Sequence, residues 1–234
     1  METLLAHLAP GLRKLAPQGK LTGEHGELAH FEGITALFVI DLEMSGSNAQ
    51  LHEVLDVGGV RATLTPGLPE EQSWGSRVRP KHIGNAEAGA LKVVGYNPKA
   101  WKTAVELEAA FEKIAEIGRD AMIAGWGIGQ DMAFLAESFR RVNQPWPFAA
   151  VALDIQPLAR TILKGGGTVD RFNLGHVADR LGIGRMGEHG ALPDAYATYD
   201  VLVKLLERVA NPVPGDSSGS SSATPSQWSI GRLA

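Results

Sequence analysis

The chain has 234 residues, of which 44% are hydrophobic and 21% are charged, so it is long enough to bury a full core. Its formal net charge of -4 argues against broad coating of nucleic acid, which needs many Lys and Arg contacts, but permits a small end-binding site. Cysteine is absent, which excludes disulfides, thiolate zinc sites and cysteine nucleophiles. Because no stretch reaches the roughly 20 apolar residues of a membrane helix, we expect a cytoplasmic protein with no membrane partner.

The first part of the chain predicts an extension followed by strands. Residues 1–33 are expected to be an N-terminal extension and connector, because Pro10-Gly11 interrupts a leucine repeat and a glycine-rich polar stretch follows it. Residues 34–40 are almost wholly apolar, which predicts a strand covered on both faces. Residues 51–65 predict one or two further strands, with a turn at 47–50 before them.

The rest of the chain predicts a loop and then helices alternating with strands. Several prolines and charges between residues 66 and 90 indicate a long irregular loop. Asn97-Pro98 supplies an N-cap and a first-turn proline for a helix that ends at Gly118. Short apolar strands are predicted at 121–124 and 148–153. Further helices are predicted to begin near Asp131, Ile155, Leu174 and Pro193.

This order of elements predicts an α/β fold with a mixed central sheet flanked by helices. Residues 34–211 are expected to form one folded domain. After Pro212-Val213-Pro214 the composition changes to Gly, Ser, Thr and Pro, so residues 212–234 are expected to be a disordered C-terminal tail.

Acidic residues occupy the edges of three of these elements. Asp41 and Glu43 end the first strand and point to the same side, about 7 Å apart along the backbone. Asp131 follows a glycine-rich turn into a helix, and Asp194 opens the last helix. Sites in α/β folds usually form at one end of the sheet, so the acids can converge there on a divalent cation. His189 precedes the last helix and is expected to lie in the loop before it.

Simpler interpretations exist for each residue alone. An isolated Asp-x-Glu at a strand end is usually a solvated edge, and Asp131 and Asp194 also suit helix N-termini, where the dipole favours acids. Only the spacing of His189 from Asp194 favours a catalytic role for His189 over that of an ordinary surface loop residue. The combination of all these residues favours catalysis.

Together the residues resemble the three motifs of the DEDDh 3′–5′ exonucleases. The matching stretches are Asp41-Leu-Glu43-Met-Ser-Gly46, Gly129-Gln-Asp131-Met-Ala-Phe-Leu135 and His189-Gly-Ala-Leu-Pro-Asp194-Ala195. That family includes the proofreading exonuclease subunit of bacterial DNA polymerase, ribonuclease T and oligoribonuclease, and the first motif is particularly similar to its oligoribonuclease form. The resemblance spans roughly residues 34–210 and implies a ribonuclease-H-like fold.

The resemblance also implies a two-metal hydrolase that releases nucleoside 5′-monophosphates from the 3′ ends of single-stranded DNA or RNA. Two divalent cations, Mg²⁺ or Mn²⁺, are implied. Asp41, Glu43 and Asp194 would ligate the more deeply held one, Asp41 would also reach the second, and Asp131 would join the metal site through water. His189 would act as the general base. Relatives are often homodimers or partners of a polymerase or processing enzyme, which makes such partners an expectation for this chain.

Substrate contacts are expected beside the first two motifs. By the resemblance, Leu42 and Met44 would touch the terminal nucleotide, and Ser45 keeps a hydroxyl where Thr is usual. Trp126 could stack on a base, a contact that tolerates any sequence. Relatives often have His-Asn where this chain has Trp126-Gly127.

Other functions stay open on the sequence. A nuclease-fold binding or adaptor module with weak catalysis is the main alternative, because of the change at Trp126-Gly127. A metal phosphoesterase for small nucleotides would need a closed pocket. The basic group at Arg77, Arg79, Lys81 and His82 most simply belongs to a solvated loop, although it could guide a substrate backbone.

Overall fold

The structure is a computed structural model that describes residues 8, 12–14, 33–163, 172–184 and 190–211. In these residues a sheet of six strands has the order β1-β6-β5-β2-β3-β4. The strands are β1 (Leu12–Lys14), β2 (Ala36–Met44), β3 (Val54–Thr63), β4 (Glu70–Arg77), β5 (Met122–Gly125) and β6 (Val151–Asp154). The helices are α2 (Ala88–Val94), α3 (Leu107–Ile117), α4 (Gly129–Arg141), α5 (Ile155–Leu163), α6 (Leu174–Arg180) and α7 (Ala191–Ala210), with 3-10 turns η3 (Ile83–Asn85) and η4 (Ala100–Thr103).

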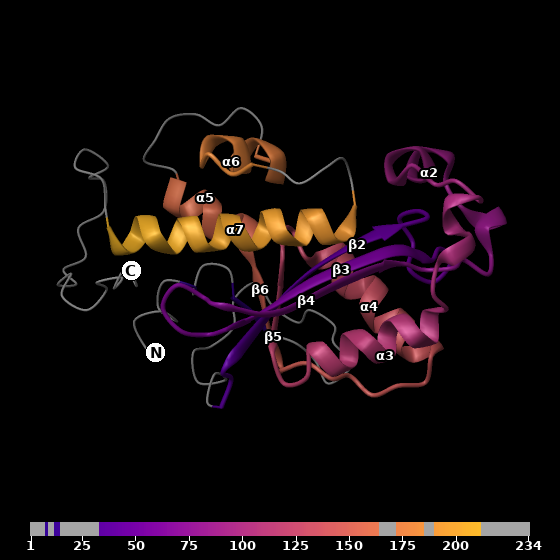
Figure 1. The fold of residues 1–234 in the computed structure, drawn as a ribbon, viewed down its shortest axis with the longest axis horizontal. Helices are drawn as coiled ribbons and strands as arrows, with labels where there is room; N and C mark the ends of the chain where they lie inside the picture. The colour runs from indigo at the N-terminus through magenta and orange to yellow at the C-terminus, as the bar shows by residue number, and fades with distance from the viewer. Residues whose placement is uncertain (1–7, 9–11, 15–32, 164–171, 185–189, 212–234) are drawn as a thin grey trace.

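The sheet is mixed. β2, β3 and β4 form an antiparallel meander, whereas β5 pairs parallel to both β2 and β6. Helices cover both faces: α5, α6 and α7 lie on one, and α3 and α4 lie on the other (Figure 1). The predicted α/β class with a mixed sheet flanked by helices is therefore confirmed.

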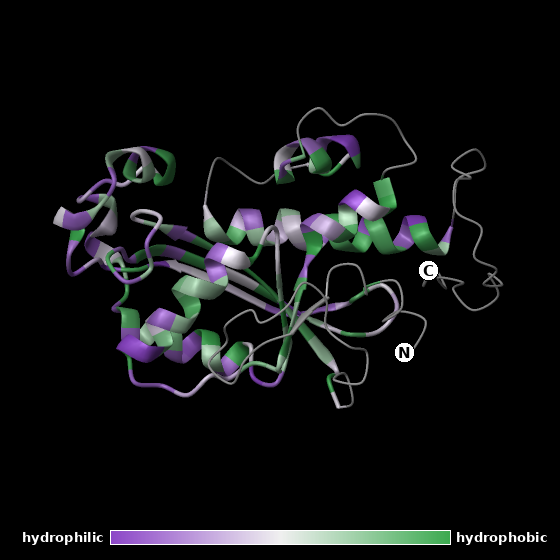
Figure 2. Cartoon of the chain, turned by 180° about the vertical axis from the view of Figure 1, so that it is seen from behind, coloured by the Kyte–Doolittle hydropathy of each residue, from purple (hydrophilic) through white to green (hydrophobic). Residues whose placement is uncertain are grey.

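Hydrophobic side chains fill the two interfaces between the sheet and its helices. The central strands are mostly hydrophobic in Figure 2, as expected of strands buried on both faces. Alternation along β2 divides its residues, so that Leu37 and Val39 pack toward α7 while Phe38, Ile40 and Leu42 pack toward α3 and α4. The side chains at positions 41 and 43 thus belong to the α7 face.

The expectation of one irregular loop over residues 66–90 was wrong. Residues 70–77 form strand β4, and α2 begins at Ala88, near the end of the same stretch. β4 is an edge strand whose side chains are exposed or half-buried, so its sequence lacks the apolar pattern of a buried strand. Residues 51–65, for which one or two strands were predicted, contain the single strand β3. The third strand of the meander is therefore β4.

The helix expected to start at Asn97-Pro98 begins later. Asn97 accepts a hydrogen bond from the Lys99 amide at 2.9 Å, but the turn that follows is the short η4. Trp101 is buried there and donates its indole N–H to the Leu55 carbonyl at 3.0 Å, which ties η4 to the sheet. The α-helix proper, α3, starts at Leu107.

Other predicted elements match the structure closely. α4 starts two positions before the predicted Asp131. Asp154 accepts the Gln156 amide at 3.1 Å at the start of α5, and Gly182 has a left-handed φ of 70° after α6. Part of the expected extension joins the sheet, because β1 pairs antiparallel with β6 and Leu8 lies in the core. Among the described residues, no helix is both long and apolar enough to cross a membrane.

Candidate active site

Two of the predicted acids come from β2. Its residues are buried through Ile40, and the strand then continues to Met44 with half-buried Asp41 and Glu43. Both carboxylates face α7, as the alternation along the strand requires. The pair therefore lies on the side of the sheet that α7 covers, at the C-terminal end of β2.

The third acid, Asp194, lies in the first turn of α7. Asp41, Glu43 and Asp194 each offer a carboxylate oxygen, and these oxygens all lie within 4.8 Å of one another. Three acids at that separation repel strongly unless a cation or protons neutralise them. Oxygen-rich clusters of this kind suit hard divalent cations, so the residues fit the metal that the motifs imply.

Asp131 approaches the same site from the opposite face of the sheet. It lies in the first turn of α4, is 9% exposed, and accepts a hydrogen bond from the Leu42 amide at 3.2 Å. The pairing of β5 with β2 ends at Val39, so the Leu42 amide on that side has no strand partner. Asp131 replaces that partner and is thereby fixed beside Asp41.

Burial and crowding raise the pKa values of both inner carboxyls. Burial is the main cause that raises the pKa of Asp131, to about 7, and Glu43 and Asp154 act in the same direction. Burial likewise holds the pKa of Asp41 well above its usual range, and the charges of Asp131 and Asp194 add to the effect. A bound cation would reverse this balance, because it favours the ionised carboxylates.

Glycines in the meander position the first turn of α7. A side chain at Gly58 would overlap the backbone of Ala191 and Leu192, and one at Gly75 would lie 2.7 Å from the Leu192 Cβ. The helix therefore rests directly on the β3 and β4 backbones. Gly58 itself faces Asp41 in the β2–β3 register, which brings Asp194 over the β2 acids.

Asp56 holds the same turn by hydrogen bonding. Asp56 lies opposite Glu43 in the register of β2 and β3. Its carboxylate accepts the Val57 amide at 2.9 Å and the amide of Ala191. N-cap Gly190 offers no side-chain acceptor for α7, so Asp56 performs that role from a neighbouring strand. Sequence reasoning gave Asp56 no such role; the Gly58-Gly59 pair inside a strand was the available signal of close backbone approach.

Trp126 follows β5 on the α7 face. Its ring stacks on Phe172 with centroids 5.8 Å apart and planes inclined by 17°, and it remains partly exposed. Asp154 fixes the adjoining turn by accepting the Gly127 amide at 3.0 Å. The structure thus gives Trp126 a protein partner on one side.

The other predicted substrate residues are held within the fold. Leu42 is buried against α4, and Met44 packs half-buried against the same cluster. The Ser45 hydroxyl accepts the Glu53 amide at 2.8 Å, which closes the turn between β2 and β3. Contact of these residues with a nucleotide stays a prediction. His189 lies outside the described residues, and the description resumes at Gly190, directly before α7.

Two curated bacterial proteins are similar to this chain in sequence. A protein of Mycobacterium tuberculosis named as a bifunctional exonuclease/endonuclease is 24% identical over 86% of this chain and 33% of its own length. The epsilon subunit of DNA polymerase III from Aquifex aeolicus is 25% identical over 73% of this chain and 80% of that subunit. The chain thus spans about a third of the first relative and most of the second.

Solved structures show the same fold. E. coli exonuclease I in complex with a dT13 oligonucleotide superposes with a TM-score of 0.63 at 18% identity, over 74% of this chain and 41% of that one. The predicted ribonuclease-H-like fold is confirmed by this likeness. Residues 38–202 match the family model RNase_T, described as Exonuclease, and they contain Asp41, Glu43, Asp131 and Asp194. The chain therefore belongs to the RNase_T family of exonucleases, the DEDDh family that its motifs resemble.

Proposed function

We propose that the chain is a metal-dependent 3′–5′ exonuclease that hydrolyses phosphodiester bonds at the 3′ end of single-stranded nucleic acid and releases nucleoside 5′-monophosphates. The observation that carries the proposal is the cluster of Asp41, Glu43 and Asp194, whose oxygens lie within 4.8 Å of one another. Asp131 lies beside Asp41 in the same site. The relatives named above include an exonuclease bound to a single strand, which supports this substrate class.

In this proposal Asp41, Glu43 and Asp194 would hold two divalent cations, Mg²⁺ or Mn²⁺, and Asp131 would assist through water. Such cations, when bound, stabilise negative charge on the attacking and departing oxygens of the phosphodiester. Asp131 orients the β2 end through the Leu42 amide. His189 takes the proton from the attacking water, from the segment that leads directly into α7.

The remaining residues hold the strand. Leu42 and Met44 contact the terminal nucleotide, through backbone atoms where the side chains are buried, and Ser45 supports their turn. Trp126 stacks on a base with the face that Phe172 does not cover. We further propose that the protein acts in the cytoplasm, either as a homodimer or beside a polymerase or processing partner, as the epsilon relative suggests.

One assay tests the reaction. Single strands of DNA and RNA, labelled at either end, are incubated with Mg²⁺ or Mn²⁺ and the full chain. We expect stepwise shortening of 5′-labelled strands and immediate release of a 3′ label as a mononucleotide. Asp41→Asn should reduce the rate to the blank, and His189→Ala should reduce it by roughly 10²–10⁴-fold, the usual contribution of a general base.

The matched control is Asp120→Asn, an identical chemical change on an exposed turn whose φ of 56° Asn also accepts. It should cleave like the wild type. Strand binding without cleavage, equal in wild type and Asp41→Asn, would instead support the binding or adaptor module. Cleavage of mononucleotide esters alone would support a small-nucleotide phosphoesterase.

Trp126 provides a separate test of the strand contacts. Stacking on an aromatic ring contributes about 1–3 kcal/mol per base, so Trp126→Ala should raise KM for single strands by roughly 5- to 150-fold with little change in kcat. Trp126→Phe keeps a ring that can stack on Phe172 and on a base, and should retain most of the affinity. An unchanged KM in Trp126→Ala would contradict the stacking role.

A further inference from the structure

The stretch from the last residue of β4 to the end of η4 is basic in an otherwise acidic chain. Residues 77–103 contain six Lys or Arg residues and a single acid, Glu87, whereas the whole chain has a net charge of -4. This segment, here called the basic shoulder, contains η3, α2 and η4. It forms the end of the molecule beyond the tips of β2 and β3, next to the first turn of α7 (Figure 1).

The basic shoulder is attached directly to the candidate active site. The Glu87 amide donates to the Ser45 carbonyl at 2.8 Å, and the Glu87 carboxylate accepts the amide and the hydroxyl of Ser47. Ser45 follows Glu43 by two residues. On the other side, Trp101 is bonded to Leu55, the neighbour of Asp56. The shoulder is therefore held in a fixed position beside the acidic cluster.

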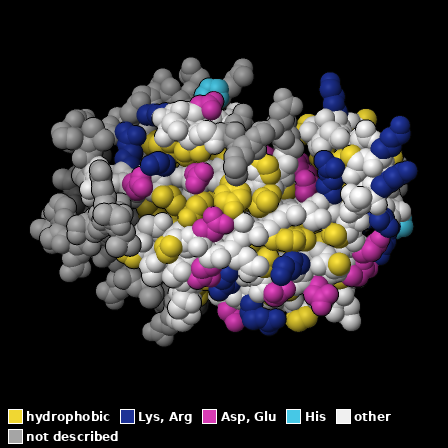
Figure 3. Space-filling model, in the orientation of Figure 1, with side chains coloured by type: hydrophobic (Ala, Val, Ile, Leu, Met, Phe, Trp, Pro, Cys, Tyr) yellow, Lys and Arg dark blue, Asp and Glu magenta, His cyan; other side chains and the backbone are white. Residues whose placement is uncertain are grey.

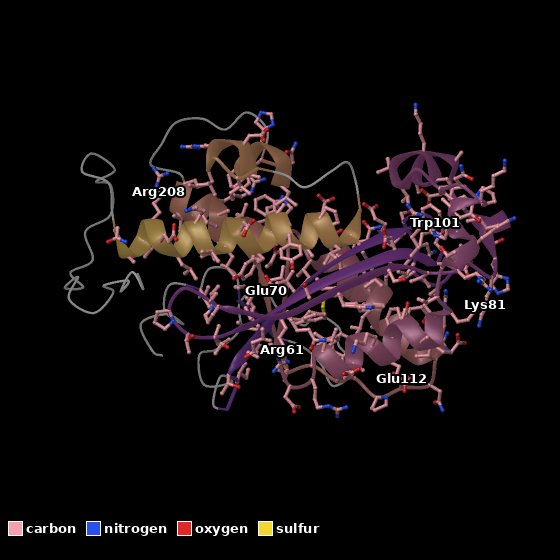
Figure 4. The ribbon with its side chains drawn as sticks, viewed as in Figure 1. Arg61, Glu70, Lys81, Trp101, Glu112 and Arg208 are labelled. Carbon is pink, nitrogen blue, oxygen red and sulfur yellow. The ribbon has the colours of Figure 1, made fainter. Side chains whose placement is uncertain are left out.

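The two arginines of the basic shoulder, Arg77 and Arg79, hydrogen-bond to backbone carbonyls of the protein. Arg77 donates to the Ala100 carbonyl at 3.1 Å and lies 4.6 Å from the centre of the Trp101 ring. Arg79 bonds to the carbonyls of Lys102 and Ala104 and pairs with Glu106. Figure 4 labels Trp101 within this end of the molecule and Lys81 at its margin, where Lys81 pairs with Glu108 at 2.8 Å. The side chains of Arg77, Arg79 and Lys81 therefore already have protein partners.

Three lysines differ from them. Lys92 on α2 and Lys99 and Lys102 around η4 are exposed, and within the described part of the chain their side chains enter no ion pair. Lys and Arg side chains gather over this end of the molecule in Figure 3. Val93, next to Lys92, is 58% exposed and offers an apolar contact between the charges.

We propose that Lys92, Lys99 and Lys102 bind phosphates of the single strand upstream of its 3′-terminal nucleotide. The proposal rests on the proposed function, since it extends the substrate site from the acids onto the basic shoulder. Flexible ammonium groups suit a phosphate backbone because they bind it without reading sequence. The acidic remainder of the chain would repel a strand elsewhere and so confines it to this path.

This placement makes binding depend on strand length and on salt. A dinucleotide fills only the acidic site, whereas a longer strand also reaches the lysines. Each phosphate contact with a single strand contributes about 0.7 to the slope of log affinity against log salt. Loss of three contacts should therefore lower that slope by about 2.

Fluorescence anisotropy of the full chain tests the surface without cleavage. In the Asp41→Asn background with EDTA, the affinity for a 15-nucleotide strand is measured from 50 to 300 mM KCl. The variant Lys92→Gln/Lys99→Gln/Lys102→Gln should bind the 15-mer at least about tenfold more weakly at low salt, with the lower slope. In the active background with Mg²⁺ or Mn²⁺, KM for cleavage of a dinucleotide by the lysine variant should change less than twofold.

The control variant is Lys113→Gln/Arg119→Gln/Lys204→Gln, which removes the same charge from α3, its following turn and α7. It should retain the salt slope. An equal loss in both triple variants, or an unchanged slope in the first, would overturn the proposal, because net charge alone or no contact would then explain the data.

Cleavage by the same variants in the active background separates this proposal from the proposed function. We expect KM for the 15-mer to rise in the lysine variant while kcat stays unchanged. If the wild type binds strands through the lysines but cleaves none, the surface stands and the exonuclease proposal fails. If it cleaves normally with an unchanged salt slope in the lysine variant, the surface fails and the exonuclease proposal stands.

Discussion

At the scale of single residues, the inner carboxyls of the site titrate far from their usual range. Burial raises the pKa of Asp131 to about 7, whereas the same group in the unfolded chain has an ordinary value near 3.9. Between these values the unfolded chain loses its proton first, so the metal-free fold becomes less stable as pH rises from about 4 to about 7. Asp41 acts with the same sign, because its pKa is also raised.

Replacing Asp131 by Asn should therefore stabilise the metal-free protein at pH 8. Asn is neutral at every pH and its amide oxygen can still accept the Leu42 amide, so we expect a gain on the order of 2–4 kcal/mol in unfolding free energy and a smaller loss of stability between pH 4 and 7. Urea unfolding in EDTA at several pH values measures both the free energy of unfolding and its pH dependence. Asp120→Asn should change neither quantity, and an equal pH dependence in wild type and Asp131→Asn would show that Asp131 is ionised in the fold.

The four acids of the site could be found from the sequence because their chemistry forms a pattern. Asp41 and Glu43 stand one residue apart at the end of an apolar run, and Asp131 and Asp194 open helices. Asp56 could not be found in this way. Its role depends on the register that sets it opposite Glu43 and on the approach of Ala191, and both are tertiary facts.

At the scale of elements, the placement of α7 depends on glycine. Gly58→Ala should force the first turn of α7 away from β3, since its side chain would overlap the Ala191 and Leu192 backbone. We expect a loss of about 1–3 kcal/mol in stability, as for other overpacked sites, and a much larger loss of cleavage because Asp194 moves away from Asp41.

Thermal unfolding and single-turnover cleavage of the same samples would separate these two losses. Gly89→Ala in α2 is the matched control, since a side chain there meets no atom within 4 Å. A Gly58→Ala variant that keeps full activity would show that α7 does not need this close contact.

Most elements were predictable where burial leaves a pattern. β2, β5 and the helices α3 and α4 carry apolar residues at the period of their structure. β4 was missed because an exposed edge strand shows no such period, and its place is set by pairing with β3 from Asp56 to Ala62. The start of α3 was misjudged because the buried Trp101 draws the preceding residues into a short 3-10 turn.

At the scale of the whole molecule, cation binding should stabilise the fold. A ligand at 100 times its Kd contributes about 2.7 kcal/mol, which corresponds to a rise in Tm of roughly 5–10 °C for a chain of this size. The affinity should increase as pH rises toward 7, because the cation displaces protons from Asp41 and Asp131.

Differential scanning calorimetry with Mn²⁺ or EDTA at pH 5.5 and 7.5 would measure both effects. Asp41→Asn should lose the response and Asp120→Asn should keep it. A Tm that ignores the cation at both pH values would mean that the cluster of acids binds no metal. The expected domain limits, 34–211 with an extension before and a tail after, remain predictions, although β1 and Leu8 already connect part of the extension to the core.

The seat of α7 on Gly58 also has a consequence for how the protein folds. Asp41 and Glu43 come from the second strand, whereas Asp194 comes from the last helix that the structure describes, and they meet only after β3 offers its bare backbone. Such long-range contacts form late, because closing a long loop costs entropy before any contact repays it. The cation site is therefore completed among the last steps of folding. A chain that has not finished folding would contain the acids but could not yet bind the cation between them.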